Sequence, residues 1–212
     1  MHPPSFLDAR FEAVQFSISF SFGSGSGATI KPVDGRLAGG LSASKEDERL
    51  IEVKHLTKRY GHHTAVDDLT FTVESGQIYG FLGPNGAGKS TTMNIMTGCL
   101  AASAGEVKID GYDIFEQAEQ AKRLIGYLPE QPPLYLDRTP REYLTFVARA
   151  KRIAERDLQE KIDQAMAVTQ IADVSERLIR NLSKGYKQRV GIAQAILGDP
   201  EIVILDVNCR IA

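Results

Sequence analysis

A glycine-rich segment that ends in lysine and serine restricts the fold of this chain more than any other feature. Residues 83–90 fill the pattern G-x-x-x-x-G-K-[ST] without a mismatch. The apolar run 78–82 before them predicts a buried strand, and residues 92–96 continue as a helix. A glycine-rich turn that binds nothing is the alternative, but it does not explain the order of strand, loop, Lys-Ser and helix. The sequence therefore predicts an α/β fold with a phosphate loop, and so a nucleotide site.

Each residue type in this loop suits contact with phosphate. Glycines let the backbone wrap closely enough for N–H groups to point inward, and the helix dipole favours the negative charge. Lys89 places a positive charge at the β- and γ-phosphates, Ser90 offers a hydroxyl to Mg²⁺, and Thr91 can contact the α-phosphate side. The predicted nucleotide-binding residues are Gly83, Pro84, Asn85, Gly86, Ala87, Gly88, Lys89, Ser90 and Thr91.

Composition narrows the class of protein further. The chain has 212 residues, is 42 % hydrophobic and carries a net charge of −2, so a sizeable core is possible and no basic surface for nucleic acid is expected. Cys99 and Cys209 fit no metal spacing and suit a reducing cytoplasm. No apolar run reaches the roughly 18 to 20 residues that cross a bilayer. If the function involves a membrane, another polypeptide is expected to cross it.

The first 48 residues differ from the rest. Residues 16–22 alternate apolar and serine side chains as a strand does, and residues 23–27 read as a flexible Gly-Ser linker. A secretory signal is not expected, because a continuous apolar region is lacking. We interpret residues 1–48 as an atypical, disordered extension, or as upstream sequence outside the folded domain, and begin the domain at residue 49.

The domain starts with strands and continues with helices. Strands are predicted before and after the phosphate loop, at 50–54, 69–73, 105–111 and 125–129. His62 and His63 could suggest a metal site, but no second pair of ligands has matching spacing, so an exposed turn is the better interpretation. Thr139-Pro140-Arg141-Glu142 is a capping box that starts a helix, and a second helix is predicted over 156–168.

The last part of the domain repeats the strand pattern after a further helix. Residues 181–186 form a loop that leads into a helix, which ends near Gly198 and Pro200. Residues 202–206 then read as an apolar strand that ends in Asp206. In a nucleotide-binding sheet such an acid lies beside the phosphate loop and can hold Mg²⁺. Ser90 and Asp206 are therefore the predicted metal residues, although an acid at a strand end is often only a turn residue.

With the phosphate loop, the segment 182–189 and the strand 202–206 in this order, the chain resembles the ATP-binding subunit of an ABC transporter over residues 50–206. The resemblance implies an ATPase core with a mixed sheet over 49–206, a helical subdomain at about 131–182, and ATP and Mg²⁺ as cofactors. It also implies a head-to-tail dimer in which one subunit's phosphate loop and the other's segment 182–189 hold each ATP. We call residues 182–189 the signature segment.

The resemblance assigns roles to residues outside the phosphate loop. Tyr60 matches the family's aromatic that stacks on adenine, and Ser183 and Gly185 match the residues that contact the partner's γ-phosphate. The family's glutamine that senses the γ-phosphate and Mg²⁺ falls at Glu130, with Gln131 next to it, and which of the two faces the metal stays open. With Lys89 and Asp206, these two complete the predicted catalytic residues.

Two departures from the family bear on subfamily and activity. Lys184 and Tyr186 stand where glycine and glutamine are commoner, and with residues 132–135 and 141–144 they look like bacterial exporters of the ABC-2 type. After Asp206 the family continues with a glutamate that polarises water, whereas this chain has Val207, which cannot accept a proton. Residues 207–212 are a non-matching tail, so a C-terminally truncated core is expected, with one side of its sheet uncovered.

Three functions remain open at this point. The first is an ATP-driven subunit at the inner face of the cell membrane, cytoplasmic and docked on a separate transmembrane permease. The second is a hydrolysis-deficient ATP-binding protein that is regulatory or non-functional. The third is a soluble ABC-type ATPase acting on DNA or the ribosome, which is disfavoured because neither a long coiled-coil insertion nor a tandem core is present. We expect no nucleic-acid partner.

Overall fold

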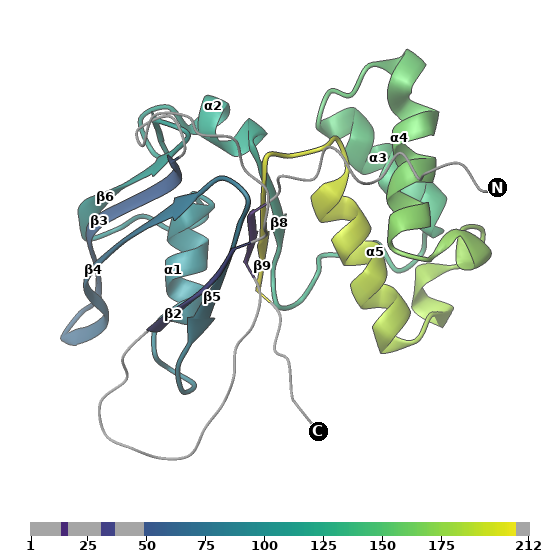
Figure 1. Cartoon of the computed structure of the whole chain (residues 1–212). Coiled ribbons are helices and arrows are strands. Elements are labelled where there is room, and N and C mark those ends of the chain that lie inside the picture. The colour runs from purple at the N-terminus through teal and green to yellow at the C-terminus, as the bar shows by residue number, and fades with distance from the viewer. Residues whose placement is uncertain (1–13, 17–30, 37–48, 207–212) are drawn as a thin grey trace.

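Two β-sheets and a layer of helices make up the protein (Figure 1). The computed structural model describes residues 14–16, 31–36 and 49–206. The two sheets and helix α1 (Lys89–Met96) share one hydrophobic core, to which Ile51, Phe81, Ile95 and Ile204 contribute side chains that are almost fully buried. The helices α3 (Pro140–Ala150), α4 (Glu155–Val168) and α5 (Lys184–Ile196) surround a second core.

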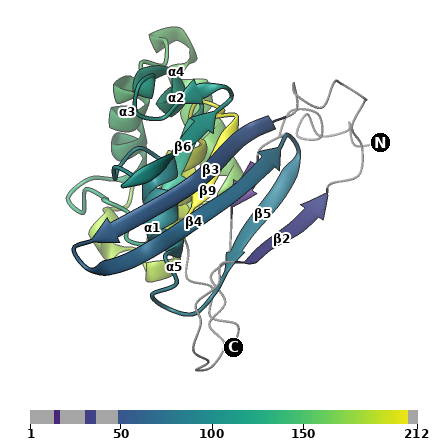
Figure 2. The ribbon, with the colours of Figure 1, turned by 90° about the vertical axis from the view of Figure 1, so that its left-hand side faces the viewer.

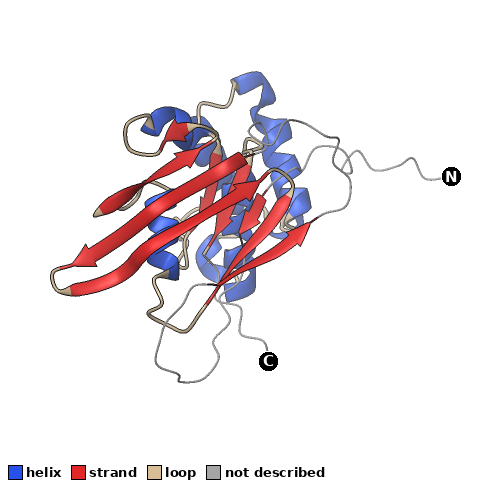
Figure 3. Ribbon diagram, turned by 60° about the vertical axis from the view of Figure 1, so that its left-hand side comes forward, coloured by secondary structure: helices blue, strands red, loops and turns tan. Residues whose placement is uncertain are grey.

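One sheet is antiparallel and contains the longest strands. β3 (Arg49–Tyr60) and β4 (His63–Glu74) form a hairpin, which is the pair of long strands in Figure 3. β6 (Ala104–Ile109) and β7 (Tyr112–Asp113) extend the sheet in the order β4-β3-β6-β7. The predicted strands 50–54 and 69–73 are confirmed and are longer than expected, because the antiparallel pairing continues from Arg49–Glu74 to Tyr60–His63. His62 and His63 lie at the exposed turn, and the described residues contain no group of three or more His, Cys, Asp or Glu side chains that could hold a metal ion.

The other sheet carries the phosphate loop. Its order is β2-β5-β1-β9-β8, with bounds β2 (Lys31–Arg36), β5 (Gln77–Leu82), β1 (Val14–Phe16), β9 (Ile202–Leu205) and β8 (Ile125–Leu128). β5, β1, β9 and β8 run parallel, and β2 is antiparallel to β5. All four residues of β9 are buried, as its apolar sequence predicts for a central parallel strand.

The structure differs from the sequence interpretation in residues 1–48. Two segments of the expected disordered extension, Val14–Phe16 and Lys31–Arg36, are strands of the second sheet (Figure 2). Of the strand expected at 16–22, Phe16 ends β1 and residues 17–22 lie outside the described part of the chain, as do the expected linker 23–27 and the tail 207–212. The expected uncovered side of the sheet is not found at β9, because β1 pairs with one of its edges and β8 with the other.

Helices α3 (Pro140–Ala150), α4 (Glu155–Val168) and α5 (Lys184–Ile196) form the helical layer, which lies across β8 and β9 from α1 (Figure 1). The capping box at Thr139 and Glu142 is confirmed, with both of its hydrogen bonds present. The helix predicted over 156–168 is confirmed as α4, and its Leu158, Ile162 and Met166 are buried, whereas Phe146 of α3 is 53 % exposed. Shorter helices are α2 (Ala118–Arg123) and the 3₁₀ turns Ala172–Val174 and Ile179–Asn181.

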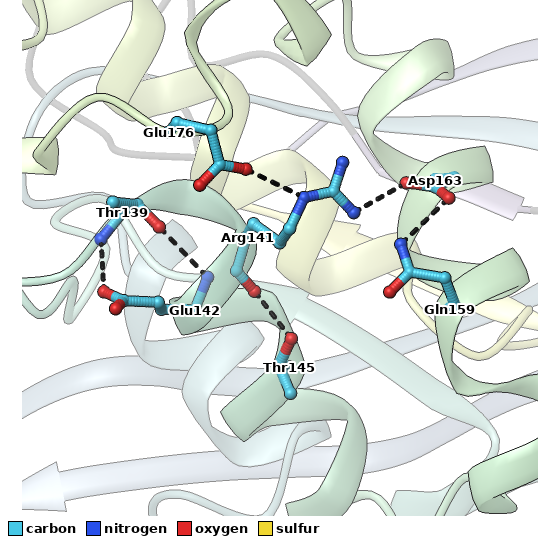
Figure 4. A network of polar contacts seen from close by, with 7 residues as sticks. All are labelled: Thr139, Arg141, Glu142, Thr145, Gln159, Asp163 and Glu176. Carbon is cyan, nitrogen blue, oxygen red and sulfur yellow. Dashed lines mark hydrogen bonds and ion pairs between the residues drawn. The ribbon is translucent and has the colours of Figure 1, made fainter.

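Polar contacts tie the helical layer together. The Arg141 guanidinium at the start of α3 donates to Asp163 of α4 at 2.8 Å and to Glu176 at 3.0 Å (Figure 4). At the other end of α3, the Lys151 ammonium donates to the carbonyls of Gln194, Ala195 and Leu197. These carbonyls are at the C-terminus of α5, where a positive charge is favourable. α3 is therefore fixed to both other helices.

None of the helices in the described ranges is long and apolar enough to span a bilayer.

Candidate nucleotide site

Helix α1 begins directly after Gly88, which lies against β4 and leaves no room there for a side chain. Gly88 caps α1 with φ of 85°, in the left-handed region that favours glycine. A Cβ there would lie 2.3 Å from the backbone oxygen of Ala65 in β4. No side chain caps this helix end, and its first turn carries no acidic residue. The positive end of the helix dipole therefore meets no anionic side chain from its own first turn.

Lys89 folds back over the loop that precedes it. Its ammonium donates to the carbonyls of Gly83 and Pro84, both at 2.7 Å, and the residue is only 8 % exposed. Burial lowers the pKa of Lys89, while the negative charge of Asp206 acts in the opposite direction. The Lys89 ammonium is thus held by hydrogen bonds to carbonyls of the phosphate loop. It is also close enough to Asp206 for the two charges to interact.

Asp206 meets the phosphate-loop helix at the end of β9. Its backbone N–H donates to the carbonyl of Leu128 at 2.8 Å, which fixes the backbone of Asp206 beside the end of β8, and the residue is 7 % exposed. The Ser90 hydroxyl lies close enough to the Asp206 carboxylate to lower its pKa. Burial has the larger effect and raises the pKa of Asp206, while Ser90 and Lys89 oppose this increase. The structure therefore brings together the two residues predicted to hold Mg²⁺, and their hydroxyl and carboxylate oxygens are the ligand type that Mg²⁺ prefers.

Glu130 lies at the same edge of the sheet. β8 and β9 pair in parallel with Leu128 opposite Leu205, so Glu130 and Asp206 both follow the carboxyl ends of neighbouring strands. The charge of Glu130 contributes to the raised pKa of Asp206, and both Glu130 and Gln131 are exposed. The site thus contains a second carboxylate within electrostatic reach of the first.

Tyr127 is a residue of this site that the sequence interpretation missed. Its hydroxyl donates to Oδ1 of Asn94 in α1 at 3.0 Å, which joins β8 to the phosphate-loop helix. Burial raises the pKa of Tyr127 to about 12, and the charge of Asp206 adds to the increase. The alternation of buried and half-buried residues in β8 shows which face Tyr127 occupies. Its partner Asn94 lies 33 positions away in the sequence, so residue spacing alone could not identify the contact.

Tyr60 lies at the turn of the β3–β4 hairpin and is 49 % exposed. Tyr60 pairs with His63, and Ala65, two residues further along, is the residue that approaches Gly88. This end of the hairpin is therefore close to the phosphate loop. The Lys58 ammonium lies 5.0 Å from the centroid of the Tyr60 ring, a cation–π distance.

The signature segment lies on the helical layer, apart from these residues. Ser183 caps α5 by accepting a hydrogen bond from the N–H of Tyr186 at 3.3 Å. Ser183, Lys184 and Gly185 are exposed, and a Cβ at Gly185 would meet only the Ser183 hydroxyl, at 3.9 Å. Tyr186 turns away to donate to Asp173 at 3.0 Å. Because α5 lies across β8 and β9 from α1 (Figure 1), one chain keeps its signature segment on a different part of its surface from its phosphate loop.

A model of the family described as "ABC transporter" matches residues 66–208. The chain belongs to this family. It is 38 % identical over 157 residues to the uncharacterized ABC transporter ATP-binding protein YxlF of Bacillus subtilis, covering 74 % of this chain and 52 % of that protein. It is also 38 % identical over 157 residues to the bacitracin transport ATP-binding protein BcrA of Bacillus licheniformis, with 74 % and 50 % covered. The chain thus spans about half the length of these relatives.

A solved structure supports the same assignment. The structure of an ATP-binding subunit of an ABC transporter superposes with a TM-score of 0.63 at 29 % sequence identity, covering 74 % of this chain and 65 % of that one. The predicted α/β core with a mixed sheet and a helical subdomain is confirmed. The resemblance stated from the phosphate loop, the signature segment and the strand 202–206 is therefore correct.

Proposed function

We propose that this chain binds Mg-ATP between its phosphate loop and Asp206, as the ATP-binding part of a transport system. The burial of Lys89 and Asp206 beside each other carries the proposal, because it places a cation at the start of α1 and a carboxylate at the end of β9 in one site, with the Ser90 hydroxyl near that carboxylate. Lys89 would contact the β- and γ-phosphates, Ser90 and Asp206 would hold Mg²⁺, and Thr91 would face the α-phosphate. The relatives that are named transport ATP-binding proteins support this reading.

Tyr60 would stack on the adenine. Its ring is half exposed at the end of the hairpin that approaches Gly88, and an aromatic face is a suitable surface for a base. Glu130 and Gln131 would lie near the γ-phosphate and the metal. Glu130 is the stronger candidate of the two, because its charge already acts on Asp206.

The ATP site would be completed by a second copy in a head-to-tail dimer. Ser183 and Gly185 are exposed at the start of α5 with open space around the glycine, so a second copy's γ-phosphate could approach their N–H groups. A separate transmembrane permease would carry the substrate, with this chain on the cytoplasmic face of the membrane. Exposed aromatic and apolar side chains on α3 and in the segment before it offer area for that contact, namely Phe146, Tyr135 and Leu136.

Hydrolysis by this chain is less well supported than binding. Val207 stands where the family has a glutamate, and a valine side chain has no proton acceptor. The second candidate function is therefore an ATP-binding protein that does not turn over and acts on intact subunits as a regulator, or does not act at all. Nucleotide binding without phosphate release separates this candidate from the first.

The phosphate-loop assignment is tested with Lys89→Ala. Charge-assisted contacts to phosphate are strong, so we expect the affinity for Mg-ATP in calorimetry to fall at least about tenfold, or roughly 1.4 kcal/mol. Lys108→Ala is the matched control, because it removes a lysine whose ion pair with Glu106 lies on the surface of the other sheet. Equal ATP affinity of Lys89→Ala and the parent chain would refute the assignment.

A further inference from the structure

The strand that leads into the phosphate loop is held by the N-terminal part of the chain. β5 pairs with β1 on one edge, through Gln15–Ile78 and Phe16–Tyr79. It pairs with β2 on its other edge over all six residues, from Lys31–Leu82 to Arg36–Gln77. Within the described ranges, these two strands are the neighbours of β5 in its sheet. Both lie before residue 66, where the match to the family begins.

β1 also separates the two halves of the candidate site. On its far edge it pairs with β9 through Val14–Ile202, Gln15–Val203 and Phe16–Ile204. Neighbouring strands lie about 4.8 Å apart, so the strand before Lys89 and the strand before Asp206 are held roughly 10 Å apart by the strand between them. An empty slot would leave two rows of backbone N–H and C=O groups unpaired beside the core, which is costly.

We propose that the strands β1 and β2 act as an internal strand complement that sets the position of the phosphate loop relative to Asp206. β1 fixes the spacing of β5 and β9, and β2 covers the outer edge of β5. Nucleotide binding then depends on a segment that the family match does not include. This inference rests on the proposed function for its effect on ATP binding, but its placement of the strands can be tested separately.

The strand placement is tested by a disulfide crosslink in the full-length chain, with Cys99→Ser and Cys209→Ser as background. Gln15→Cys with Val203→Cys puts the two cysteines at paired positions, whereas Gln15→Cys with Ile204→Cys puts them on opposite faces of the sheet. Because side chains alternate along a strand and a disulfide needs close Cβ atoms, the first pair should crosslink at least about tenfold faster under mild oxidation. Equal rates, or no crosslink in the first pair, would overturn the proposal.

The functional consequence is tested with Gln15→Pro against the matched control Gln15→Thr. Proline removes a ladder donor in the middle of a sheet, so Gln15→Pro should weaken Mg-ATP binding at least about tenfold and lower the unfolding midpoint by at least about 5 °C. Threonine, a good strand former, should leave both close to the parent values. Unchanged affinity and midpoint in Gln15→Pro would contradict the proposal, and the crosslink remains decisive if this variant does not fold.

Failure of the two proposals can be told apart. If the parent chain shows no Lys89-dependent ATP binding, yet the 15–203 crosslink forms and Gln15→Pro lowers the midpoint, the proposed function fails and the strand complement stands. If ATP binding depends on Lys89 but neither crosslink forms selectively, the strand complement is wrong and the proposed function stands.

Discussion

Two helices of this protein, α1 and α5, begin at glycine-containing segments that the sequence predicts to contact phosphate. The surroundings of the two helix starts differ. At α1, Gly88 is buried in a left-handed conformation against β4, no side chain caps the helix, and Ser90 reaches Asp206. At α5, Ser183 caps the helix itself and Gly185 faces open space. The first helix end is enclosed by the rest of its own chain, whereas the second is an exposed surface. This difference is what the proposed head-to-tail dimer would need, namely a nucleotide pocket in one chain and a separate surface for another chain's nucleotide.

The largest effect expected at the enclosed end concerns hydrolysis. General bases contribute about 10² to 10⁴ in rate, and Val207 cannot act as one, so steady-state phosphate release by the parent chain should be near background. Val207→Glu should raise the rate by about the same factor if the rest of the site is complete. Val207→Gln is the matched control, since it is similar in size but a poor base.

Turnover by the parent chain would change this interpretation. Mg-dependent hydrolysis that disappears in Lys89→Ala would show that another group takes the proton. Glu130 would then be the first candidate, because it is the second carboxylate at this sheet edge. Loss of that activity in Glu130→Gln would identify it.

The contrast between the two glycines can be measured directly. Gly88→Ala combines a left-handed φ with a Cβ placed 2.3 Å from a backbone oxygen, so we expect a loss of about 2 to 4 kcal/mol in the free energy of unfolding and loss of Mg-ATP binding. At Gly185 there is space for a Cβ, and the residue lies in α5. Gly185→Ala should therefore leave the free energy of unfolding unchanged or raise it by up to about 1 kcal/mol. Thermal unfolding and calorimetry on the two variants are sufficient.

Gly185→Ala further tests the role of the exposed end. If that surface binds a second copy's nucleotide, the variant should keep the parent's ATP affinity as a monomer and lose ATP-dependent dimerisation, measured by analytical ultracentrifugation with Mg-ATP. A fall in monomer affinity equal to that of Gly88→Ala would show that both glycines act within one chain, and the contrast between them would be wrong.

A smaller effect is expected from the pKa of Asp206. Mg²⁺ binds the carboxylate form, so affinity for Mg-ATP should fall as the pH falls through the pKa of Asp206, by up to about tenfold per pH unit. Burial raises this pKa, so the fall should begin at a higher pH than for an ordinary aspartate, whose pKa is about 3.9. Asp206→Asn is the control, because its side chain does not titrate. Any pH dependence of its weaker Mg-ATP binding therefore comes from titration of ATP itself.

The raised pKa of Asp206 has the opposite effect on the stability of the nucleotide-free chain, which should decrease with rising pH. The folded state holds the proton of Asp206 more tightly than the unfolded state does, so stability should fall as the pH rises from the unfolded pKa to the folded one. In Asp206→Asn this contribution to the pH dependence of the free energy of unfolding should be absent, as measured by denaturant unfolding at a series of acidic pH values. A parent chain and variant with parallel pH profiles would contradict the raised pKa.

The smallest effect is expected in the helical layer. Arg141 is partly buried between Asp163 and Glu176 (Figure 4), so Arg141→Ala should cost about 1 kcal/mol in the free energy of unfolding, with unchanged ATP affinity. Arg156→Ala, which removes an exposed arginine from α4, should stay within about 0.5 kcal/mol of the parent. Weaker ATP binding in Arg141→Ala would show that the helical layer also shapes the nucleotide pocket.

Local signals in the sequence were sufficient for most of the elements. The phosphate loop was predicted from the strand, glycines and Lys-Ser in order, and the start of α3 from its capping box, which forms as expected. The strand β9 was predicted from its continuous apolar run, and all four of its residues are buried. The lengths of β3 and β4 were underestimated, because antiparallel pairing between them extends each strand beyond its apolar centre.

By itself, the sequence determined the family, most of the elements after residue 49, and Lys89, Ser90 and Asp206 as the candidate site. Only the tertiary structure decided that β1 and β2 flank β5, that Tyr127 joins Asn94, and that Glu130 acts on Asp206. The physical reason is that helices, caps and loops depend on neighbours within a few positions. The choice of strand partner depends instead on hydrogen bonds and packing between segments far apart in the chain, for which a short run such as Val14–Phe16 carries almost no pattern of its own.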